Sequence, residues 1–291
     1  MEVISATGIV MLVGLALGII LVICSKVFYV PVNEKIAKLS DAMPGANCGA
    51  CGFAGCDDYA EKLGNGEETD PSQCPVGGAD LTEKLSEILG IDTSPQEKKV
   101  AVVMCNGNRD ARGVIMEYHG MISCSAAKHL YGGAAACPHG CLGFGECEKV
   151  CQFDAIHVCN GVAVVDREKC VSCGKCAQVC PNNLIRMAPI KNTVIVQCSS
   201  HDKGKAVMEV CKNGCIGCGK CSRACKFDAI TMDNNVARID PDLCKNCGLC
   251  VKECPTGSII NMKAKRKPAG EAKPAKKAEA KVETKAEAKE A

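Results

Sequence analysis

The cysteine array that begins at Cys215 limits the fold of this chain more than any other feature. It reads C-x2-C-x2-C-x3-C, and the same run recurs from Cys244, where Pro255 closes it. Thiolates two residues apart on a tight turn converge on one metal centre, which a disulfide framework does not need. A third cysteine at the same step is typical of a 4Fe-4S cluster, whereas structural zinc sites usually take paired C-x2-C knuckles. The array therefore predicts two iron-sulfur clusters.

The composition also indicates a metal-rich protein. The 291 residues include 26 cysteines, 5 phenylalanines and no tryptophan, so aromatic packing cannot dominate the core. Cysteine at this density occurs in secreted disulfide scaffolds or in metal-rich intracellular proteins, and the spacing favours the second. The net charge of +2 indicates no particular partner, and we expect no nucleic acid. A structural zinc protein is the non-redox alternative.

An uncharged segment lies near the start of the chain, from Val3 to Ser25. As a helix it would be roughly 34 Å long, enough to cross the hydrocarbon core of a bilayer. We therefore predict one transmembrane helix. A cleaved signal peptide is the alternative, but the start is not basic and no A-x-A site closes the run.

Lysines follow this segment, at Lys26, Lys35 and Lys38, whereas Glu2 precedes it. The positive-inside rule then places the bulk of the chain on the cytoplasmic side of a bacterial inner membrane, as a single-pass protein. A reducing compartment suits unprotected thiolates. Residues 31–43, with apolar side chains at helical spacing, are expected to form an amphipathic helix after the span.

A glycine-rich loop with three cysteines comes next, and a fourth cysteine stands before Pro75. The glycines allow backbone amides to approach a cluster and donate to its sulfurs. The spacing C-x2-C-x4-C-x17-C is typical of a small 4Fe-4S domain. Its predicted ligands are Cys48, Cys51, Cys56 and Cys74.

Two short apolar segments are strand candidates. Residues 100–104 lead to Cys105, and residues 193–196 lead to Cys198. Strands that each end in a cysteine could bring the two thiols together.

An internal repeat extends over the second half of the chain. Nine cysteines recur after 74 residues without a gap, and Phe153–Ile156 matches Phe227–Ile230. The first copy has Cys124, Cys137, Cys141, Cys147, Cys151, Cys170, Cys173, Cys176 and Cys180. The second has Cys198, Cys211, Cys215, Cys221, Cys225, Cys244, Cys247, Cys250 and Cys254. The chain thus contains two tandem ferredoxin-like modules.

One position breaks the repeat, because Cys218 of the second copy corresponds to Phe144 of the first. In a two-cluster ferredoxin the first three cysteines of a run bind one cluster and the fourth binds the other. The complete predicted sets are Cys215, Cys218, Cys221 with Cys254; Cys244, Cys247, Cys250 with Cys225; and Cys170, Cys173, Cys176 with Cys151. The incomplete set is Cys141, Cys147 and Cys180, and Cys137, one helical turn before Cys141, is the candidate for its vacancy.

The remaining cysteines suggest a sixth cluster between the copies. Its predicted ligands are Cys105, Cys124, Cys198 and Cys211. Six clusters would leave only Cys24 and Cys159 unused. Five clusters and four buried thiols are the alternative, since free cysteine often packs as a small hydrophobic residue.

Other cofactor motifs are missing from the sequence. No dinucleotide fingerprint or phosphate-binding loop occurs, and no residue is expected to act as a catalytic acid, base or nucleophile. Six lysines gather near the start of the second copy, where they could steer an acidic electron carrier, although a solvated face is the simpler interpretation. They are Lys191, Lys203, Lys205, Lys212, Lys220 and Lys226.

The amino-terminal helix, the Asn47–Gly52 loop and the tandem modules together resemble the B subunit of the Rnf complex, the ion-translocating ferredoxin:NAD oxidoreductase of bacterial membranes. The resemblance covers residues 1 to about 262. It implies a protein that accepts electrons from reduced soluble ferredoxin and passes them to other integral and peripheral subunits. It also implies that electrons arrive at the clusters of Cys215–Cys254 and leave from the cluster of Cys48–Cys74. A ferredoxin-type subunit of a hydrogenase or another membrane reductase would share every motif.

The expected fold class is α+β, with five to six 4Fe-4S clusters. We expect these parts: membrane helix 1–30, small 4Fe-4S domain 31–95, first repeat 96–190, second repeat 191–262 and a disordered tail 263–291 rich in Ala, Lys and Glu.

Overall fold

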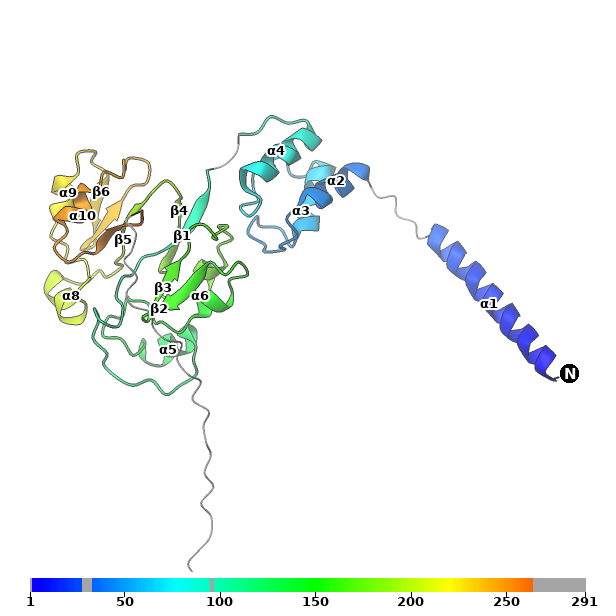
Figure 1. The fold of residues 1–291 in the computed structure, drawn as a ribbon, viewed down its shortest axis with the longest axis horizontal. Coiled ribbons are helices and arrows are strands. Elements are labelled where there is room, and N and C mark those ends of the chain that lie inside the picture. The colour runs from blue at the N-terminus through cyan, green and yellow to red at the C-terminus, as the bar shows by residue number, and fades with distance from the viewer. Residues whose placement is uncertain (1, 28–32, 95–96, 264–291) are drawn as a thin grey trace, which may run out of the picture. The chain divides into compact units, whose positions relative to one another are not determined.

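A computed structural model of the chain describes residues 2–27, 33–94 and 97–263 (Figure 1). It divides into two compact units, one of residues 1–98 with 171–173 and one of residues 99–170 with 174–291. Both helices and short strands are present, so the α+β class is confirmed. The predicted tail, apart from Lys263, lies outside the described residues.

Helix α1 (Glu2–Val27) covers the uncharged segment. Its large apolar side chains between Met11 and Ile23 are exposed. Where side chains are described, no helix combines the length and the apolarity that a membrane crossing requires. The predicted span runs from Val3 to Ser25, and the side chains of its first residues, up to residue 10, lie outside the described part of the chain.

Three further helices form the small domain of the first unit. They are α2 (Glu34–Ala42), α3 (Cys56–Asn65) and α4 (Gly78–Leu89). Helix α2 confirms the amphipathic helix expected within residues 31–43, and its apolar spacing buries Leu39 completely. Tyr59, Leu63 and Leu85 complete this core. Phe53 stacks on Tyr59 with ring centroids 4.9 Å apart, which fixes the cysteine loop against the helices.

The second unit holds two modules with the same succession of elements: strand, helix, β-hairpin, helix, strand. The first consists of β1 (Lys99–Val103), α6 (Glu146–Lys149), β2 (Ile156–Cys159), β3 (Val162–Val165), α7 (Lys175–Gln178) and β4 (Ile185–Pro189). The second consists of β5 (Val194–Val196), α9 (Lys220–Ala224), β6 (Ile230–Asp233), β7 (Val236–Ile239), α10 (Leu249–Glu253) and β8 (Ile259–Asn261). Strands β1 and β5 confirm the two strands expected before Cys105 and Cys198.

Each module is closed by its own first and last strands. Strand β1 pairs antiparallel with β4, and β5 pairs antiparallel with β8. The internal hairpins β2–β3 and β6–β7 are tight, because Asn160–Gly161 and Asn234–Asn235 adopt the positive φ angles that such turns need.

A longer segment lies between the first strand and the first helix of each module. In the first module it carries α5 (Cys124–Tyr131), and in the second it carries α8 (Gly204–Val210). The two segments are hydrogen-bonded to each other, since Asn106 N donates to Gln197 O at 3.0 Å and Lys212 N donates to Ala111 O at 2.7 Å. These segments join the modules.

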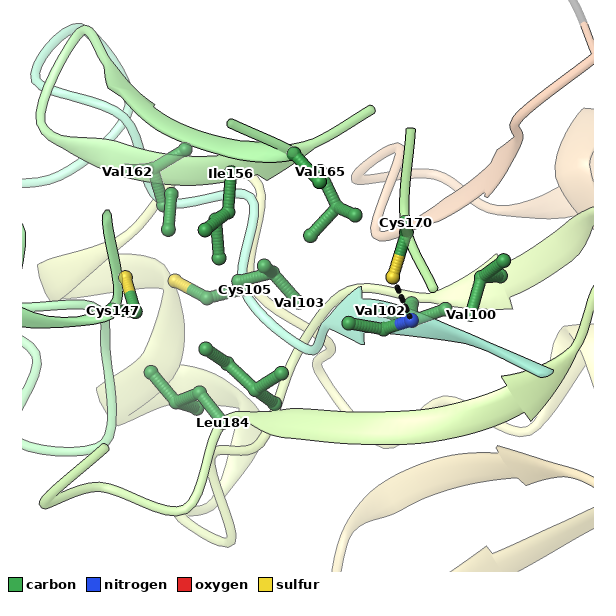
Figure 2. Close-up of a cluster of buried hydrophobic side chains, with 14 of the residues drawn as sticks. Val100, Val102, Val103, Cys105, Cys147, Ile156, Val162, Val165, Cys170 and Leu184 are labelled. Atoms are coloured by element: carbon green, nitrogen blue, oxygen red, sulfur yellow. Dashed lines mark hydrogen bonds between the residues drawn. The ribbon is translucent and has the colours of Figure 1, made fainter. Parts of the chain in front are cut away.

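The core of the first module mixes small apolar side chains with cysteines. Figure 2 shows Val100, Val102 and Val103 of β1 facing Ile156 and Leu184, with Cys105, Cys147 and Cys170 among them. Valine and cysteine thus fill the space that aromatic residues occupy in most cores, as the composition predicts.

Candidate metal centres

Three cavities in the second unit are each lined by four cysteines. Cavity A is lined by Cys124, Cys141, Cys147 and Cys180. Cavity B is lined by Cys105, Cys137, Cys198 and Cys211. Cavity C is lined by Cys215, Cys218, Cys221 and Cys254.

Cavity A differs in one member from the set predicted for the first copy. Cys124 joins Cys141, Cys147 and Cys180, and Cys137 does not. Burial raises the pKa of Cys147 to about 12, and the neighbouring Cys141 and Cys124 thiols add to the shift. Four thiols gathered on one cavity are suited to bind cationic iron, which neutralises the combined charge of their thiolates.

The position of the missing ligand is filled by an aromatic pair. The ring of Phe144 packs against Tyr118, with centroids 5.2 Å apart. Cys124 reaches the cavity from the first residue of α5 instead.

The carboxylate of Glu146 holds this end of α5. It accepts hydrogen bonds from the hydroxyl of Ser123 and from the backbone N–H and the hydroxyl of Ser125. Ser123 also caps the helix by accepting from the N–H of Ala126 at 3.2 Å. Cys124 is therefore fixed between two anchored serines.

The sequence places Cys137 one helical turn from Cys141, whereas in the structure Cys137 lines cavity B and not cavity A. Residues 137–140 form a turn, in which Gly140 N donates to Cys137 O at 3.3 Å, and no helix of the described residues includes them. Cys137 therefore lines cavity B, for which the sequence predicts Cys124.

Cavity B lies between the two modules and takes corresponding cysteines from each. Cys105 follows β1 and Cys198 follows β5 at the same distance along the chain, while Cys137 and Cys211 are repeat counterparts four residues before Cys141 and Cys215. The expected approach of Cys105 and Cys198 is seen here.

Two cysteines of cavity B, Cys105 and Cys211, are buried, and backbone N–H groups lie close to the sulfur of Cys105. Burial raises the pKa of Cys105 to about 11, against the opposing effect of backbone N–H groups. The N–H groups of Gly107 and Cys141 both lie 3.4 Å from Cys105 Sγ. Hydrogen bonds of this kind stabilise the thiolate form that a metal requires.

Cavity C contains one sulfur with strong local donors. Cys254 Sγ lies 3.2 Å from Ser258 Oγ and 3.7 Å from Thr256 Oγ1. Burial tends to raise the pKa of Cys254, but these hydroxyls and nearby backbone N–H groups outweigh it, so the pKa is lowered overall.

Several cysteines of the other two predicted sets pack in the apolar cores of the modules. Cys170 Sγ accepts the N–H of Ala101 at 3.3 Å (Figure 2), and Cys151 Sγ accepts that of Ala155 at 3.4 Å. Burial raises the pKa of Cys250 to about 11, with Cys244 and Cys247 close enough to add to the shift. Cys225 packs against the same core as Cys250.

The cysteine loop of the small domain is shaped by its polar and small residues. Asn47, with φ of 44°, accepts the N–H of Cys56 at 2.7 Å through its side chain. Burial raises the pKa of Cys74, and the Cys51 and Cys48 thiols are near enough to contribute.

No group of three or more His, Cys, Asp or Glu side chains in the described residues is placed to hold one metal ion. In a cubane each thiolate binds a different iron atom, so the sulfurs stand farther apart than they do around one ion. Four thiols on a common cavity, with backbone N–H groups directed at their sulfurs, fit such a cluster.

Two polar residues of these sites were missed by the sequence analysis. Glu146 anchors the start of α5, and Arg112 lines cavity B and donates to Cys141 O. The Ser123–Ser125 pair around Cys124 was a signal for the helix start, but nothing in the sequence pointed to Arg112. Cys24 and Cys159, which no predicted set includes, are exposed.

Three family models match the cysteine-rich parts of the chain. Residues 43–76 match the family described as "Putative Fe-S cluster", residues 163–186 match a 4Fe-4S binding domain, and residues 214–258 match a 4Fe-4S dicluster domain.

Curated relatives match over most of the chain. The B subunit of a Na(+)-translocating ferredoxin:NAD(+) oxidoreductase complex from Acetobacterium woodii is 45% identical over 87% of this chain and 76% of its own length. The B subunit of a proton-translocating ferredoxin:NAD(+) oxidoreductase complex from Clostridium ljungdahlii is 38% identical over 85% and 88%. That of an ion-translocating oxidoreductase complex from Methanosarcina acetivorans is 40% identical over 84% and 93%.

The resemblance predicted from the motifs is therefore confirmed, and electron transfer through iron-sulfur groups, rather than structural zinc binding, is the role that its family supports. The chain belongs to the family of iron-sulfur B subunits of the ion-translocating ferredoxin:NAD oxidoreductase complexes.

Proposed function

We propose that this protein holds six 4Fe-4S clusters in series and relays single electrons from a reduced soluble ferredoxin to the other subunits of its complex. The observation that carries the proposal is that cavities A, B and C are each lined by four cysteines. The cysteines of cavity B belong to none of the other five proposed sets, so a cluster held there would be the sixth.

The proposed ligand sets follow the placement of the thiols. The cluster in cavity A would take Cys124 as its fourth ligand, and the cluster in cavity B would take Cys137. The cluster in cavity C would be held by the four cysteines predicted from the sequence. The other three sets are Cys48, Cys51, Cys56, Cys74; Cys170, Cys173, Cys176, Cys151; and Cys244, Cys247, Cys250, Cys225.

The chemistry that these clusters supply is reversible one-electron transfer at a potential set by hydrogen bonds to sulfur and by burial. The chain supplies the cysteine ligands, excludes water from the clusters and fixes the distances between them. Electron tunnelling falls steeply with distance, so several centres in series can carry charge across a unit that one centre cannot. No side chain needs to act as an acid or a base.

The second module has the charge expected of a docking surface for an acidic carrier. At five positions it has an exposed lysine where the first copy has a neutral or acidic residue. The pairs are Lys212 for Pro138, Lys220 for Glu146, Lys226 for Gln152, Lys245 for Val171 and Lys252 for Gln178. Cys218 and Cys247 are exposed on the same module, which would bring a docked donor close to a cluster.

We further propose that α1 anchors the protein in the bacterial inner membrane with a single pass and the rest on the cytoplasmic side. The exposed apolar side chains from Met11 to Ile23 and the lysine that ends the helix support this arrangement. The cluster of the small domain, nearest to α1 in the chain, would pass electrons to the integral subunits.

The test is an anaerobic count of iron, sulfide and zinc in the full chain, followed by reduction with a chemically reduced ferredoxin. Six clusters predict about 24 iron atoms and as many sulfides per chain. About 20 of each would contradict the sixth cluster, and zinc without sulfide would overturn the electron-transfer role. The double variant Lys220→Glu with Lys226→Glu should slow reduction by ferredoxin at low salt. Lys84→Glu, the same change on the exposed face of α4, should not.

A further inference from the structure

We propose that Arg112 is the shared counter-charge of cavities A and B and that it raises the reduction potentials of the clusters bound there. This inference rests on the proposed function, because it assumes that both cavities hold clusters. It assigns a role to a charged side chain that no cluster needs as a ligand.

The guanidinium of Arg112 is hydrogen-bonded to the backbone of a cavity A residue. Its Nη1 donates to the carbonyl of Cys141, a cavity A residue, and its Nη2 donates to the carbonyl of Gly161 at 3.1 Å. The same side chain lines cavity B. The backbone of Arg112 pairs with that of Cys211, so the residue is fixed to the second module as well.

Arg112 also passes close to two sulfurs of cavity B. A methyl group added at Gly107 would lie 3.5 Å from Cys105 Sγ, 3.5 Å from Cys211 Sγ and 3.9 Å from Arg112 Cδ. The two sulfurs and the Arg112 side chain therefore all lie around Gly107.

This cation has no carboxylate partner. Among the ion pairs formed by residues 33–94 and 97–263, none includes Arg112. The acid nearest to it in the chain, Asp110, accepts from the side chain of Asn160 at 2.7 Å instead. The negative charge that Arg112 is placed to balance is therefore that of the thiolate sites.

The expected effect follows from the charge change on reduction. One electron arrives from the preceding centre, no bond forms or breaks, and the cluster with its four thiolates becomes more negative by one charge. A fixed cation nearby stabilises the reduced state more than the oxidised state, and it does so most strongly where water is excluded. The two sites beside Arg112 should thus be easier to reduce than they would be without it.

The experiment is a redox titration followed by electron paramagnetic resonance on the full, cluster-loaded chain. Arg112→Gln removes the charge and keeps donor groups, and Arg112→Lys keeps the charge and loses the fork geometry. We expect Arg112→Gln to shift two of the reduction steps to lower potential and Arg112→Lys to lie close to wild type. Lys84→Gln, which removes an exposed cation of α4, is the control and should titrate as wild type.

Three results would overturn the inference. Arg112→Gln could titrate as wild type, Arg112→Lys could shift as far as Arg112→Gln, or Arg112→Gln could lose iron, which would make the residue structural. The iron and sulfide content of the wild-type chain decides the proposed function separately, so the two failures can be told apart.

Discussion

The Glu146 carboxylate accepts two hydrogen bonds from Ser125, one from its backbone N–H at 3.2 Å and one from its hydroxyl at 2.9 Å. Ser125 follows Cys124 directly, and Glu146 precedes Cys147, so one carboxylate ties together two thiols that are far apart in the sequence. In the second copy the counterpart of Glu146 is Lys220. The anchor is thus specific to the copy that has Phe144 in place of a cysteine.

We predict that Glu146→Ala loosens the cluster of cavity A. The part-buried N–H of Ser125 loses its acceptor, and a hydrogen bond of this kind contributes roughly 1 kcal/mol. About four iron atoms per chain, those of the cluster in cavity A, should therefore be released to a chelator faster in this variant than in the wild type. Glu168→Ala, at an exposed position of the same module, is the control. Equal release from both variants would show that the anchor is not needed.

Pairs of cysteine variants test the exchange of Cys124 and Cys137. We expect Cys105→Ser with Cys198→Ser to remove about four iron atoms per chain, because both line cavity B, and Cys105→Ser with Cys124→Ser to remove about eight. The measurement is iron content after anaerobic purification. If each double variant lost only about four iron atoms per chain, Cys105 and Cys124 would share one cluster. Cys124 would then belong to cavity B, as the sequence predicts.

Ser258→Ala should lower the potential of the cluster in cavity C. The hydroxyl lies 3.2 Å from Cys254 Sγ and is almost fully buried, so its removal takes away a hydrogen bond that stabilises negative charge on sulfur. A redox titration measures the shift. The control is Ser222→Ala, because Ser222 Oγ donates to the carbonyl of Ile230 and to no sulfur. Equal potentials in the two variants would contradict this role of Ser258.

Gly217→Ala should destabilise the second module more than Gly257→Ala. Both glycines have positive φ, so each substitution costs about 1–2 kcal/mol in backbone conformation. At Gly217 the new methyl group would also lie 2.9 Å from the carbonyl oxygen of Asn235, whereas nothing lies within 4 Å at Gly257. Thermal unfolding measures the difference, and similar midpoints for both variants would mean that the loop can move away from the hairpin.

The stability of the cluster-free chain should fall at alkaline pH. Burial raises the pKa of Cys105 and of Cys250 to about 11, whereas unfolded thiols titrate near about 8.5. The folded chain retains protons that the unfolded chain releases, so its free energy of unfolding is undiminished below about pH 8.5 and decreases as the pH rises toward 11. Anaerobic urea unfolding at several pH values measures this. Cys105→Ala should flatten the decrease, and a stability that rises over this range would contradict the prediction.

Much of the fold was predictable because its signals are local. The apolar segments before Cys105 and Cys198 form β1 and β5, and the amphipathic segment after residue 31 forms α2. The spacing of Cys215, Cys218 and Cys221 places three thiols on one loop, and a loop of this kind is determined by a few neighbouring residues.

The assignment of Cys124 and Cys137 was not predictable, because it depends on contacts between distant segments. The repeat aligns Cys124 with Cys198, yet the structural counterpart of Cys198 is Cys105, since both follow the first strand of a module. Helical spacing suggested Cys137 for the vacancy near Cys141, but the turn at Gly140 directs it elsewhere. Only the paths of the two joining segments decide which thiol lines which cavity.

Cavity B is lined by two cysteines from each copy, at corresponding positions. Each copy by itself is therefore half of a binding site, and a chain cut between residues 190 and 191 would leave both fragments without it. A cluster bound there would belong to neither half, so the duplication would do more than double the number of redox centres. Its loading would report whether the two halves have assembled correctly.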